Sequence, residues 1–539
     1  MTTADAASVF SVFRTTATAT PDAPFLILPS GRTDGTGTPV LHSYEAVLKY
    51  VRARADAYAA AGIGQGDRVA LLIGNRPEFF VEFLALNALG AGIVPLNPDL
   101  RRDEIQYVLE HSEARLAVAA AALEPQLRDA ADGLALQIAT SRFGEPAHLP
   151  VLGPARTVPS GIGHDTECAL LYTSGTTGRP KGCVLSNLYF LEAGGSYTRH
   201  GGLAAMEPGR ERFYNPLPLF HMNHLAVTAT AAMLLGNALV ITERFSPSRW
   251  WGEIVECGAT IVHYLGIVVA TLMNAPPGNL DRAHRVKFAF GAGVEPQLHG
   301  AFEDRFGFPL LEVWGMTETG RVFIANREPR QIHTRAFGKA FPGFEARVVD
   351  EHDRDVPDGT DGELVVRYSA ATPRRAFFSG YLKNDAATEE AWRGGWFHSG
   401  DVVRRDTDGM LYFVDRKKNI IRRSGENIAA AEVEAVLQAH EKVAQVAVIA
   451  VPDELREEEV YACVVPMPGV RADSALLDDL LDWCGERLAY YKAPGWVLFL
   501  DTLPTTGTQK VQKTQIFAAG EDARTRPGAF DVRHRKKRG

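Results

Sequence analysis

Two long parts of the chain alternate short apolar runs with segments of helical periodicity, and this alternation constrains the fold most. The strand-like runs are residues 69–73, 92–96 and 116–119 in the first part, and residues 239–242, 260–265, 286–290 and 310–313 in the second. Helices are predicted between them, for example at residues 79–89 and 296–306. Strands that alternate with helices form parallel sheets covered by helices. The sequence therefore predicts an α/β fold built from parallel βαβ sheets.

The sequence changes character near residue 344. Residues 344–368 consist of short alternating runs, broken by Pro-Asp-Gly and Asp-Gly turns. Such turns join neighbouring antiparallel strands. We therefore expect a small antiparallel unit to follow the parallel sheets in a large N-terminal domain of several subdomains.

A second domain is predicted to begin near Asp415, where a charged segment precedes a helix. The apolar residues of that helix recur at helical spacing, and Asn427 is available as its cap. Strand-like runs and an amphipathic stretch at residues 476–488 follow, which is typical of a small α+β domain. We expect an N-terminal domain at residues 1–415 and a mobile C-terminal domain at residues 416–539.

Composition excludes several classes of protein. A chain of 539 residues with 46% hydrophobic and 23% charged residues can form more than one globular core. No apolar run reaches the roughly 18 residues of a membrane span, and the N-terminus lacks the apolar region of a secretory signal. The five cysteines are scattered without a CxxC pair, which favours a reducing compartment. These features predict a cytoplasmic protein without disulfides or a zinc site.

The charge distribution gives no reason to expect nucleic acid as a partner. The net charge is −8 and is spread along the chain. The basic residues 533–538 are the exception, and we expect them to form a solvated, disordered terminus.

The segment "LYTSGTTGRPKGCVLSN" at residues 171–187 is rich in Ser, Thr and Gly around one lysine, Lys181. Its composition alone also fits a flexible surface turn. A turn that follows a buried strand, however, offers backbone N–H groups, hydroxyls and one cation, which together suit a polyphosphate. A Walker-type loop would place Ser or Thr after the lysine and no Arg-Pro before it, whereas Arg179-Pro180 precede Lys181 and Gly182 follows it. The segment thus predicts a different kind of phosphate loop.

The motif "YTSGTTGRPKG" resembles the phosphate loop of the adenylate-forming superfamily. Six further motifs of that family occur in the same order: "PLFHMN", "GAG", "VWGMTETG", "GWFHSGD", "DRKKNIIRRSGENI" and "TQKVQK". They extend from residue 172 to residue 513 and so cover most of the chain. The last two motifs are closest to the acyl-CoA ligase branch, in particular the carnitine-type CoA ligases.

The resemblance implies an enzyme that activates a carboxylic acid with ATP and Mg²⁺ to an acyl-adenylate, releases pyrophosphate, and transfers the acyl group to coenzyme A. A carrier-protein thiol, an amine or another nucleophile as acceptor stays open, because the first half-reaction needs the same motifs. From another class, a non-catalytic nucleotide-binding protein stays open as well. The acid and the oligomeric state are not determined by the sequence.

The resemblance also implies the residues of the nucleotide site. The catalytic residues would be Thr177, Lys181, Glu318 and Lys510, with Glu318 as the Mg²⁺ ligand. Contacts to ATP or AMP would come from Thr173, Ser174, Gly175, Thr176, Gly178, Gly291, Ala292, Gly293, Glu312, Val313, Trp314, Gly315, Met316, Thr317, Asp401 and Arg416. In this set Trp314 would stack on adenine, and Asp401 would accept hydrogen bonds from both ribose hydroxyls.

The remaining expected roles concern the acid, the hinge and coenzyme A. The acid pocket would include His221, Gly266 and Ile267, whereas His224 is expected in the core. Lys418 would be the hinge about which the C-terminal domain rotates between the half-reactions. Coenzyme A would pass the segment Arg422, Arg423, Ser424 and Gly425. Relatives read Thr-Gly-Lys where this chain has Thr508-Gln509-Lys510, yet the context favours Lys510 over Lys513 as the adenylation lysine.

Overall fold

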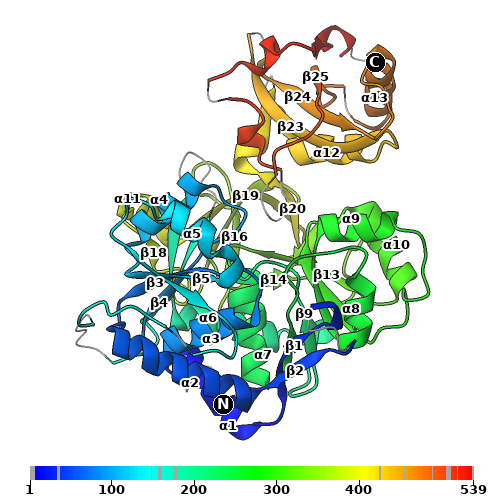
Figure 1. Cartoon of the computed structure of the whole chain (residues 1–539). Helices are drawn as coiled ribbons and strands as arrows, with labels where there is room; N and C mark the ends of the chain where they lie inside the picture. The colour runs from blue at the N-terminus through cyan, green and yellow to red at the C-terminus, as the bar shows by residue number, and fades with distance from the viewer. Residues whose placement is uncertain are drawn as a thin grey trace. The chain divides into compact units, whose positions relative to one another are not determined.

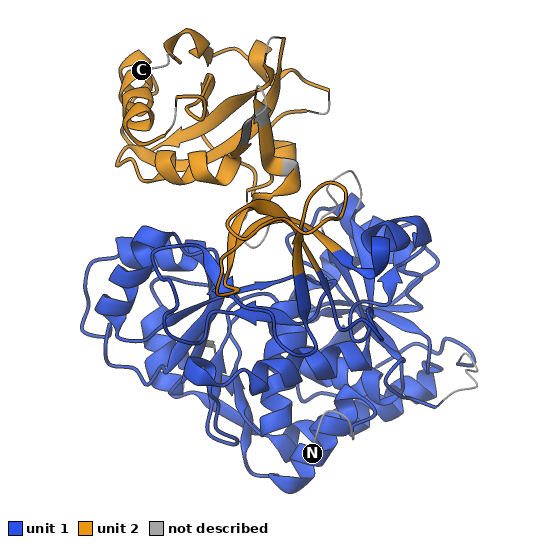
Figure 2. Cartoon of the chain, turned by 180° about the vertical axis from the view of Figure 1, so that it is seen from behind, with its two compact units in different colours: residues 1–346, 366–397 blue, residues 347–365, 398–539 orange. Residues whose placement is uncertain are grey.

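The computed structural model describes residues 6–32, 37–146, 148–155, 161–173, 180–423, 426–454, 456–488, 490–505, 511–518 and 520–536. The chain divides into two compact units (Figure 2): residues 1–346 with 366–397, and residues 347–365 with 398–539. The predicted boundary after residue 415 falls inside the second unit and stays a prediction. No helix in the described ranges is long and apolar enough to cross a membrane.

The first unit contains a seven-stranded sheet, of which β3, β4, β5 and β18 are labelled in Figure 1. Its order is β18-β8-β7-β4-β3-β5-β6, with β3 at Arg68–Leu72, β4 at Gly92–Pro95, β5 at Leu116–Ala120, β6 at Gln137–Ser141, β7 at Glu167–Thr173, β8 at Lys181–Ser186 and β18 at Gly380–Tyr381. The strands β3 to β7 are parallel, which confirms the predicted βαβ pattern, whereas β8 and β18 add an antiparallel edge. Leu109 of α4 (Arg102–Ser112) and Leu127 of α5 (Glu124–Ala130) pack against Leu72.

An eight-stranded sheet forms the other large layer of this unit. Its order is β14-β13-β12-β11-β9-β10-β1-β2, with β1 at Pro24–Leu28, β2 at Val40–Ser43, β9 at Arg212–Tyr214, β10 at Ala238–Val240, β11 at Ile261–Leu265, β12 at Phe288–Ala292, β13 at Leu310–Gly315 and β14 at Val322–Ile324. The six inner strands are parallel and the two edge strands are antiparallel. Four of these strands match the predicted positions within a few residues.

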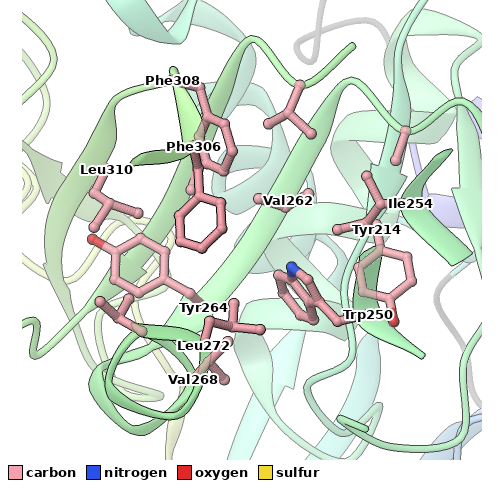
Figure 3. Close-up of a cluster of buried hydrophobic side chains, with 14 of the residues drawn as sticks. Tyr214, Trp250, Ile254, Val262, Tyr264, Val268, Leu272, Phe306, Phe308 and Leu310 are labelled. Carbon is pink, nitrogen blue, oxygen red and sulfur yellow. The ribbon is translucent and has the colours of Figure 1, made fainter. Parts of the chain in front are cut away.

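Aromatic side chains hold three helices against the second sheet (Figure 3). The helices are α8 (Trp250–Cys257), α9 (Gly266–Asn274) and α10 (Pro296–Phe306). Trp250 packs edge-on against Tyr214, with ring centroids 5.1 Å apart, and Phe306 lies in the same buried cluster. Because the cluster fixes the helices, it also fixes the strand ends from which the predicted site residues extend.

The remaining helices of the first unit complete its layers (Figure 1). They are α1 (Val9–Ala19), α2 (Tyr44–Ala61), α3 (Pro77–Ala88), α6 (Asn187–Arg199), α7 (Ala229–Leu235) and α11 (Asp385–Ala391), with a short strand β15 (Ala336–Gly338). A π-helix at Asn223–Thr228 leads into α7 and contacts α6. Such wide turns are uncommon and frequently lie at functional sites.

The second unit combines the predicted antiparallel strands with an α+β part. The strands β16 (Glu345–Val349), β17 (Asp361–Arg367), β19 (Phe397–Arg405) and β20 (Leu411–Arg416) neighbour one another in the order β20-β19-β17-β16. The α+β part has β21 (Ile420–Arg423), β22 (Glu426–Ala429), β23 (Val443–Asp453), β24 (Glu457–Pro466), β25 (Trp496–Phe499) and β26 (Ala529–Asp531), with helices α12 (Ala430–Gln438) and α13 (Ser474–Arg487). Both helices contribute to one buried cluster over this sheet.

The start of α12 corrects one detail of the sequence prediction. Asn427 is not the cap, because it lies within β22, opposite Arg422. The carboxylate of Asp415 accepts the Ala431 N–H instead, at 2.7 Å. This acceptor is distant in sequence, so a local capping pattern could not reveal it.

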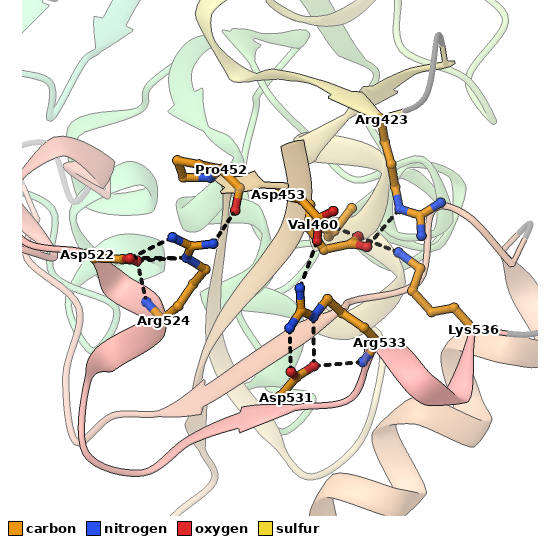
Figure 4. A network of polar contacts seen from close by, with 10 residues as sticks. Arg423, Pro452, Asp453, Val460, Asp522, Arg524, Asp531, Arg533 and Lys536 are labelled. Carbon is orange, nitrogen blue, oxygen red and sulfur yellow. Dashed lines mark hydrogen bonds and ion pairs between the residues drawn. The ribbon is translucent and has the colours of Figure 1, made fainter. Parts of the chain in front are cut away.

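The structure of the basic residues 533–536 also differs from the sequence prediction (Figure 4). Residues 533–536 do not form a solvated terminus, because their cations pair with carboxylates of the same unit. Arg533 binds Asp453 at 2.9 Å, and Lys536 binds Glu459 at 2.6 Å. The side chains of Lys536 and Glu459 are both buried. The partners are far away in the sequence, which explains why charge alone suggested a free tail.

Candidate active site

The two strands β7 and β8 hold the ends of the predicted phosphate loop. Thr173 ends β7 and pairs with Lys181, the first residue of β8. Ser174, Gly175, Thr176, Thr177 and Gly178 lie outside the described residues. The lysine is therefore placed at the base of the loop by a regular strand.

Lys181 and Glu318 meet at a residue that the sequence analysis missed, Tyr381. The Lys181 Nζ lies 4.8 Å from the centroid of the Tyr381 ring, and the Tyr381 hydroxyl donates to Glu318 Oε1 at 2.8 Å. Burial and the nearby charge of Glu318 raise the pKa of Tyr381, so its hydroxyl stays a donor. No sequence signal marked this tyrosine, because it lies on the two-residue strand β18 and reaches the site only through pairing with β8.

The turn that carries Glu318 is fixed on several sides. The Tyr189 hydroxyl donates to the Thr317 carbonyl at 2.7 Å, and the Phe378 N–H donates to the Glu318 carbonyl at 2.9 Å. Within the turn, the Met316 N–H donates to the Thr319 hydroxyl oxygen at 3.1 Å. The Glu318 side chain is only 6% exposed. The acid is thus a positioned group and not a mobile surface carboxylate.

Trp314 lies at the end of β13, just before this turn. It is buried, and its ring lies 5.6 Å from that of Phe323 and 6.2 Å from that of Phe337, at small interplanar angles. Val313 and Gly315 continue the same strand, which pairs with β14. The aromatic neighbours hold Trp314 in one orientation, while its stacking on adenine stays a prediction.

Glu312 connects three neighbouring strand ends near the Gly291–Ala292–Gly293 segment. Its carboxylate accepts the Tyr264 hydroxyl at 2.6 Å, the Gly293 N–H at 3.0 Å and the Val294 N–H at 3.3 Å. Burial raises the pKa of Glu312, and these three hydrogen bonds oppose the rise. The Glu312 carboxylate, which was predicted to contact the nucleotide, therefore holds the Gly291–Ala292–Gly293 segment in place.

Two glycines at these strand ends have no room for a side chain. A Cβ on Gly291 would lie 2.2 Å from the Tyr264 carbonyl oxygen, and one on Gly266 would lie 1.8 Å from the Gly293 carbonyl oxygen. Neither distance is possible without moving backbone. Gly266, assigned to the acid pocket, thus lies directly beside the segment assigned to adenine.

The predicted acid pocket combines a neutral imidazole with an exposed isoleucine. Burial lowers the pKa of His221 to about 4, which leaves its ring uncharged near neutral pH. Ile267 is 46% exposed on the first turn of α9. His224 is fully buried, and its Nδ1 lies 2.7 Å from the Leu217 carbonyl oxygen, as expected for a core residue.

A buried histidine beside the π-helix was not predicted. The His263 Nδ1 lies 2.9 Å from Asn223 Oδ1, and its Nε2 lies 3.2 Å from the Tyr197 hydroxyl. Burial and the nearby His224 lower the pKa of His263 well below its usual value. Its position inside an apolar strand gave no pattern that could separate it from an ordinary core residue.

In the second unit, Asp401 and Arg416 lie opposite each other on β19 and β20. The Arg416 Nε is 2.9 Å from Asp401 Oδ1, and Asp401 is 2% exposed. Lys418 follows in a short 3₁₀ turn, Lys417–Asn419, that begins directly after β20. The two predicted ribose contacts are thus brought together immediately before the predicted hinge.

The predicted coenzyme A segment is only partly described. Arg422 and Arg423 lie on β21, whereas Ser424 and Gly425 are outside the described residues. The Arg423 side chain is buried and its Nε lies 2.8 Å from Glu459 Oε2, so a contact with coenzyme A would require that pair to open. Lys510 is outside the described residues, while its alternative, Lys513, pairs with Glu434 at 2.8 Å.

Comparisons with known proteins agree with this arrangement. Residues 13–382 match the family model described as AMP-binding enzyme, and residues 432–510 match the AMP-binding enzyme C-terminal domain. The chain belongs to this family. The chain is therefore an AMP-forming ligase of the acyl-CoA synthetase class, which confirms the resemblance read from the motifs.

Individual relatives support the same class. A crotonobetaine/carnitine–CoA ligase from Salmonella arizonae is 30% identical over 88% of this chain and 92% of the relative. Its counterpart from Escherichia coli O45:K1 is 31% identical over 88% and 93%. Among solved structures, an o-succinylbenzoate CoA synthetase from Bacillus subtilis, in complex with an acyl-adenylate, has a TM-score of 0.80 at 25% identity and covers 95% of this chain and 98% of that one.

Proposed function

We propose that this chain joins a carboxylic acid to coenzyme A in two steps at the expense of ATP. In the first step a carboxylate oxygen attacks the α-phosphorus of ATP, which gives an acyl-adenylate and pyrophosphate. In the second step the thiol of coenzyme A attacks the acyl carbon, and AMP leaves with the bridging oxygen. The observation that carries the proposal is the placement of Lys181 and Glu318 around Tyr381 at the base of the phosphate loop.

The first step requires two anions to approach each other. We assign Lys181, with Thr173, Ser174, Gly175, Thr176, Thr177 and Gly178, to the β- and γ-phosphates, where a cation and donor groups lower the repulsion. Lys510 would bring a second cation to the α-phosphate and the substrate carboxylate.

Glu318 fits a role as the Mg²⁺ ligand. Its carboxylate is a hard oxygen donor, and the Tyr381 hydrogen bond holds it in one orientation. The described residues contain no group of three or more potential metal ligands, which suits an ion that takes its other ligands from phosphate and water. Bound Mg²⁺ would neutralise phosphate charge during the attack.

The contacts to the nucleoside are assigned residue by residue. We assign adenine to Gly291, Ala292, Gly293 and Trp314, with Glu312 and Tyr264 fixing the backbone of that segment. We assign the ribose hydroxyls to Asp401, which Arg416 orients through their ion pair. The other nucleotide contacts would be Val313, Gly315, Met316 and Thr317.

The second step would use a different face of the C-terminal domain. Lys418 lies where a short turn follows a strand, a location at which backbone torsions can change. Rotation there would remove Lys510 and present Arg422, Arg423, Ser424 and Gly425 to coenzyme A. We place the reaction in the cytoplasm, where ATP and coenzyme A are available.

The acid would bind beside His221, Gly266 and Ile267. The ligases with 30–31% identity are named for crotonobetaine and carnitine, so these acids stand first among the candidates. The neutral His221 gives the pocket a polar group without a charge. Short-chain, aryl and polycyclic acids complete the panel that a test must cover.

The test is a pyrophosphate-release screen over that panel, with and without coenzyme A. The proposal predicts acid-dependent release that needs Mg²⁺, and an acyl-CoA product detectable by mass when coenzyme A is present. Glu318→Gln and Lys181→Met should lose release while staying folded. If the folded wild-type protein releases pyrophosphate with no acid of the panel, the proposed adenylation is wrong.

A further inference from the structure

The segment of β19 from Ser399 to Asp401 is tied to strand β17 by two successive residues of β17. The Ser399 hydroxyl donates to the Leu364 carbonyl at 2.6 Å and accepts the Asp401 N–H at 3.1 Å. One residue earlier on β17, Glu363 Oε1 accepts the Gly400 N–H at 3.1 Å. This segment of β19 is therefore held on both sides of Gly400.

The backbone conformation of Gly400 makes the second contact specific. Its φ is +68°, in the left-handed region that favours glycine. This conformation presents the Gly400 N–H to Glu363 while the next residue, Asp401, continues along β19. Loss of the acceptor would leave this amide without its carboxylate partner.

The other oxygen of Glu363 reaches the segment that carries Arg416. Its Oε2 lies 3.0 Å from Lys417 Nζ and 3.4 Å from His398 Nδ1. Burial alone would raise the pKa of Glu363, but hydrogen bonds from His398 and Lys417 outweigh it and lower the pKa to about 2. The carboxylate is therefore ionised throughout the pH range in which the enzyme can be assayed.

One carboxylate thus contacts both segments that form the Asp401–Arg416 pair. It binds the residue before Asp401 and the residue after Arg416, and it is itself only 7% exposed. By contrast, Asp361 on the same strand points its carboxylate at Arg404 on the surface, at 2.8 Å and with 40% of its side chain exposed. Glu363, unlike Asp361, contacts residues next to both members of the pair.

We propose that Glu363 is a positioning residue that sets the orientation of Asp401 toward the ribose of ATP. The proposal rests on the ribose role assigned to Asp401 above. It adds that the recognition of the ribose hydroxyls depends on a carboxylate that does not touch the nucleotide.

The readout is the preference for ATP over its 2′-deoxy and 3′-deoxy analogues, measured as the ratio of kcat/KM in pyrophosphate release. A loss of folded protein lowers both values alike and leaves the ratio unchanged. A misplaced Asp401 lowers the value for ATP more than the values for the analogues, because each analogue lacks one of the two hydroxyls that Asp401 accepts from. Glu363→Ala should lower the preference about tenfold, on the scale of one hydrogen bond to a charged group.

Glu363→Gln refines the test, because its amide oxygen can still accept the Gly400 N–H while its charge is lost. We expect a smaller decrease in the preference for this variant than for Glu363→Ala. The matched control is Asp361→Asn, which removes a carboxylate from the same strand and should leave the preference at the wild-type value.

An unchanged preference in both Glu363 variants would overturn the proposal, even if their overall rates were low. Should Glu363→Ala fail to fold, Glu363→Gln decides the question by itself. If the wild-type enzyme releases pyrophosphate equally well with ATP and with both analogues, Asp401 does not read the ribose and the present proposal falls with that role. Acid-dependent release would still stand in that case, so the two failures are distinguishable.

Discussion

Tyr381→Phe is the sharpest perturbation of the site, because it removes one hydroxyl and keeps the ring. The ring beside Lys181, at 4.8 Å, remains, whereas the 2.8 Å hydrogen bond to Glu318 is lost. If Glu318 binds Mg²⁺, its carboxylate then loses the contact that fixes its orientation.

The size of the effect follows from the type of contact. A hydrogen bond to a charged group contributes about 1.5–3 kcal/mol, and each 1.4 kcal/mol or so changes a rate tenfold. We therefore expect ATP–pyrophosphate exchange to fall about 10- to 100-fold at low Mg²⁺, and to recover in part at high Mg²⁺. Tyr381→Leu should fall further, since it also removes the ring beside Lys181.

The assay is exchange of labelled pyrophosphate into ATP over a range of Mg²⁺ concentrations. Tyr412→Phe is a matched control, because Tyr412 donates a similar hydrogen bond to Asp406, at 2.7 Å, that has no assigned role. The double variant Tyr381→Phe/Glu318→Gln should be no worse than Glu318→Gln alone, as expected for groups that act together. Exchange by Tyr381→Phe at the wild-type rate and with the wild-type Mg²⁺ dependence would refute the reasoning.

Three further predictions concern the two half-reactions and the stability of each unit. Lys510→Ala should raise the activation free energy of adenylation by about 3 kcal/mol and still form thioester from supplied acyl-adenylate. Lys418→Pro should keep pyrophosphate exchange and lose thioester formation. Equal loss of both steps in either folded variant would disprove the two assignments. Burial alone would raise the pKa of Glu303, but hydrogen bonds from Arg330 and His299 outweigh it and lower the pKa to about 2. The ionised Glu303 therefore stabilises the fold fully above about pH 4.3, and this stabilisation is lost as the pH falls toward 2. Arg330→Met should therefore cost up to about 3 kcal/mol in urea unfolding at pH 6 and less at pH 3, and an equal cost at both pH values would contradict this. Lys536→Met should destabilise the second unit by about 1–3 kcal/mol in thermal unfolding, because it removes one partner of the buried Lys536–Glu459 pair. The control Arg535→Gln removes a more exposed ion pair and should not destabilise the unit. Equal effects of the two variants would mean that burial of the Lys536–Glu459 pair is unimportant.

The parallel sheets could be predicted because apolar runs and helical periodicity are local signals. The strands at residues 69–73 and 116–119, for example, lie within one residue of β3 and β5. The antiparallel edge β8–β18 could not be predicted in this way, since β18 has two residues and pairs with a strand nearly two hundred positions earlier. The prediction of a solvated tail was wrong for the same reason, because the partners of Arg533 and Lys536 are brought near only by folding.

The candidate site shows the same division. Lys181, Glu318 and Asp401 could be predicted as site residues because they lie in recognisable motifs, and their roles stay predictions. Tyr381 contacts Glu318 and Lys181, and Glu363 contacts Gly400, the residue before Asp401, but neither has a spacing or composition that separates it from ordinary strand residues. Supporting groups of this kind become visible only when the strands that carry them are placed.

The most direct test of the central claim is to follow oxygen from the acid to AMP. An acid of the panel that the enzyme converts would be labelled with ¹⁸O in its carboxylate and incubated with ATP, Mg²⁺, coenzyme A and the enzyme. The mass of the AMP that forms would then be measured by mass spectrometry. Because the carboxylate oxygen becomes the bridge of the acyl-adenylate and leaves with AMP, we predict one ¹⁸O atom in each AMP and none in pyrophosphate. Unlabelled AMP, or ADP with labelled phosphate in its place, would contradict the account.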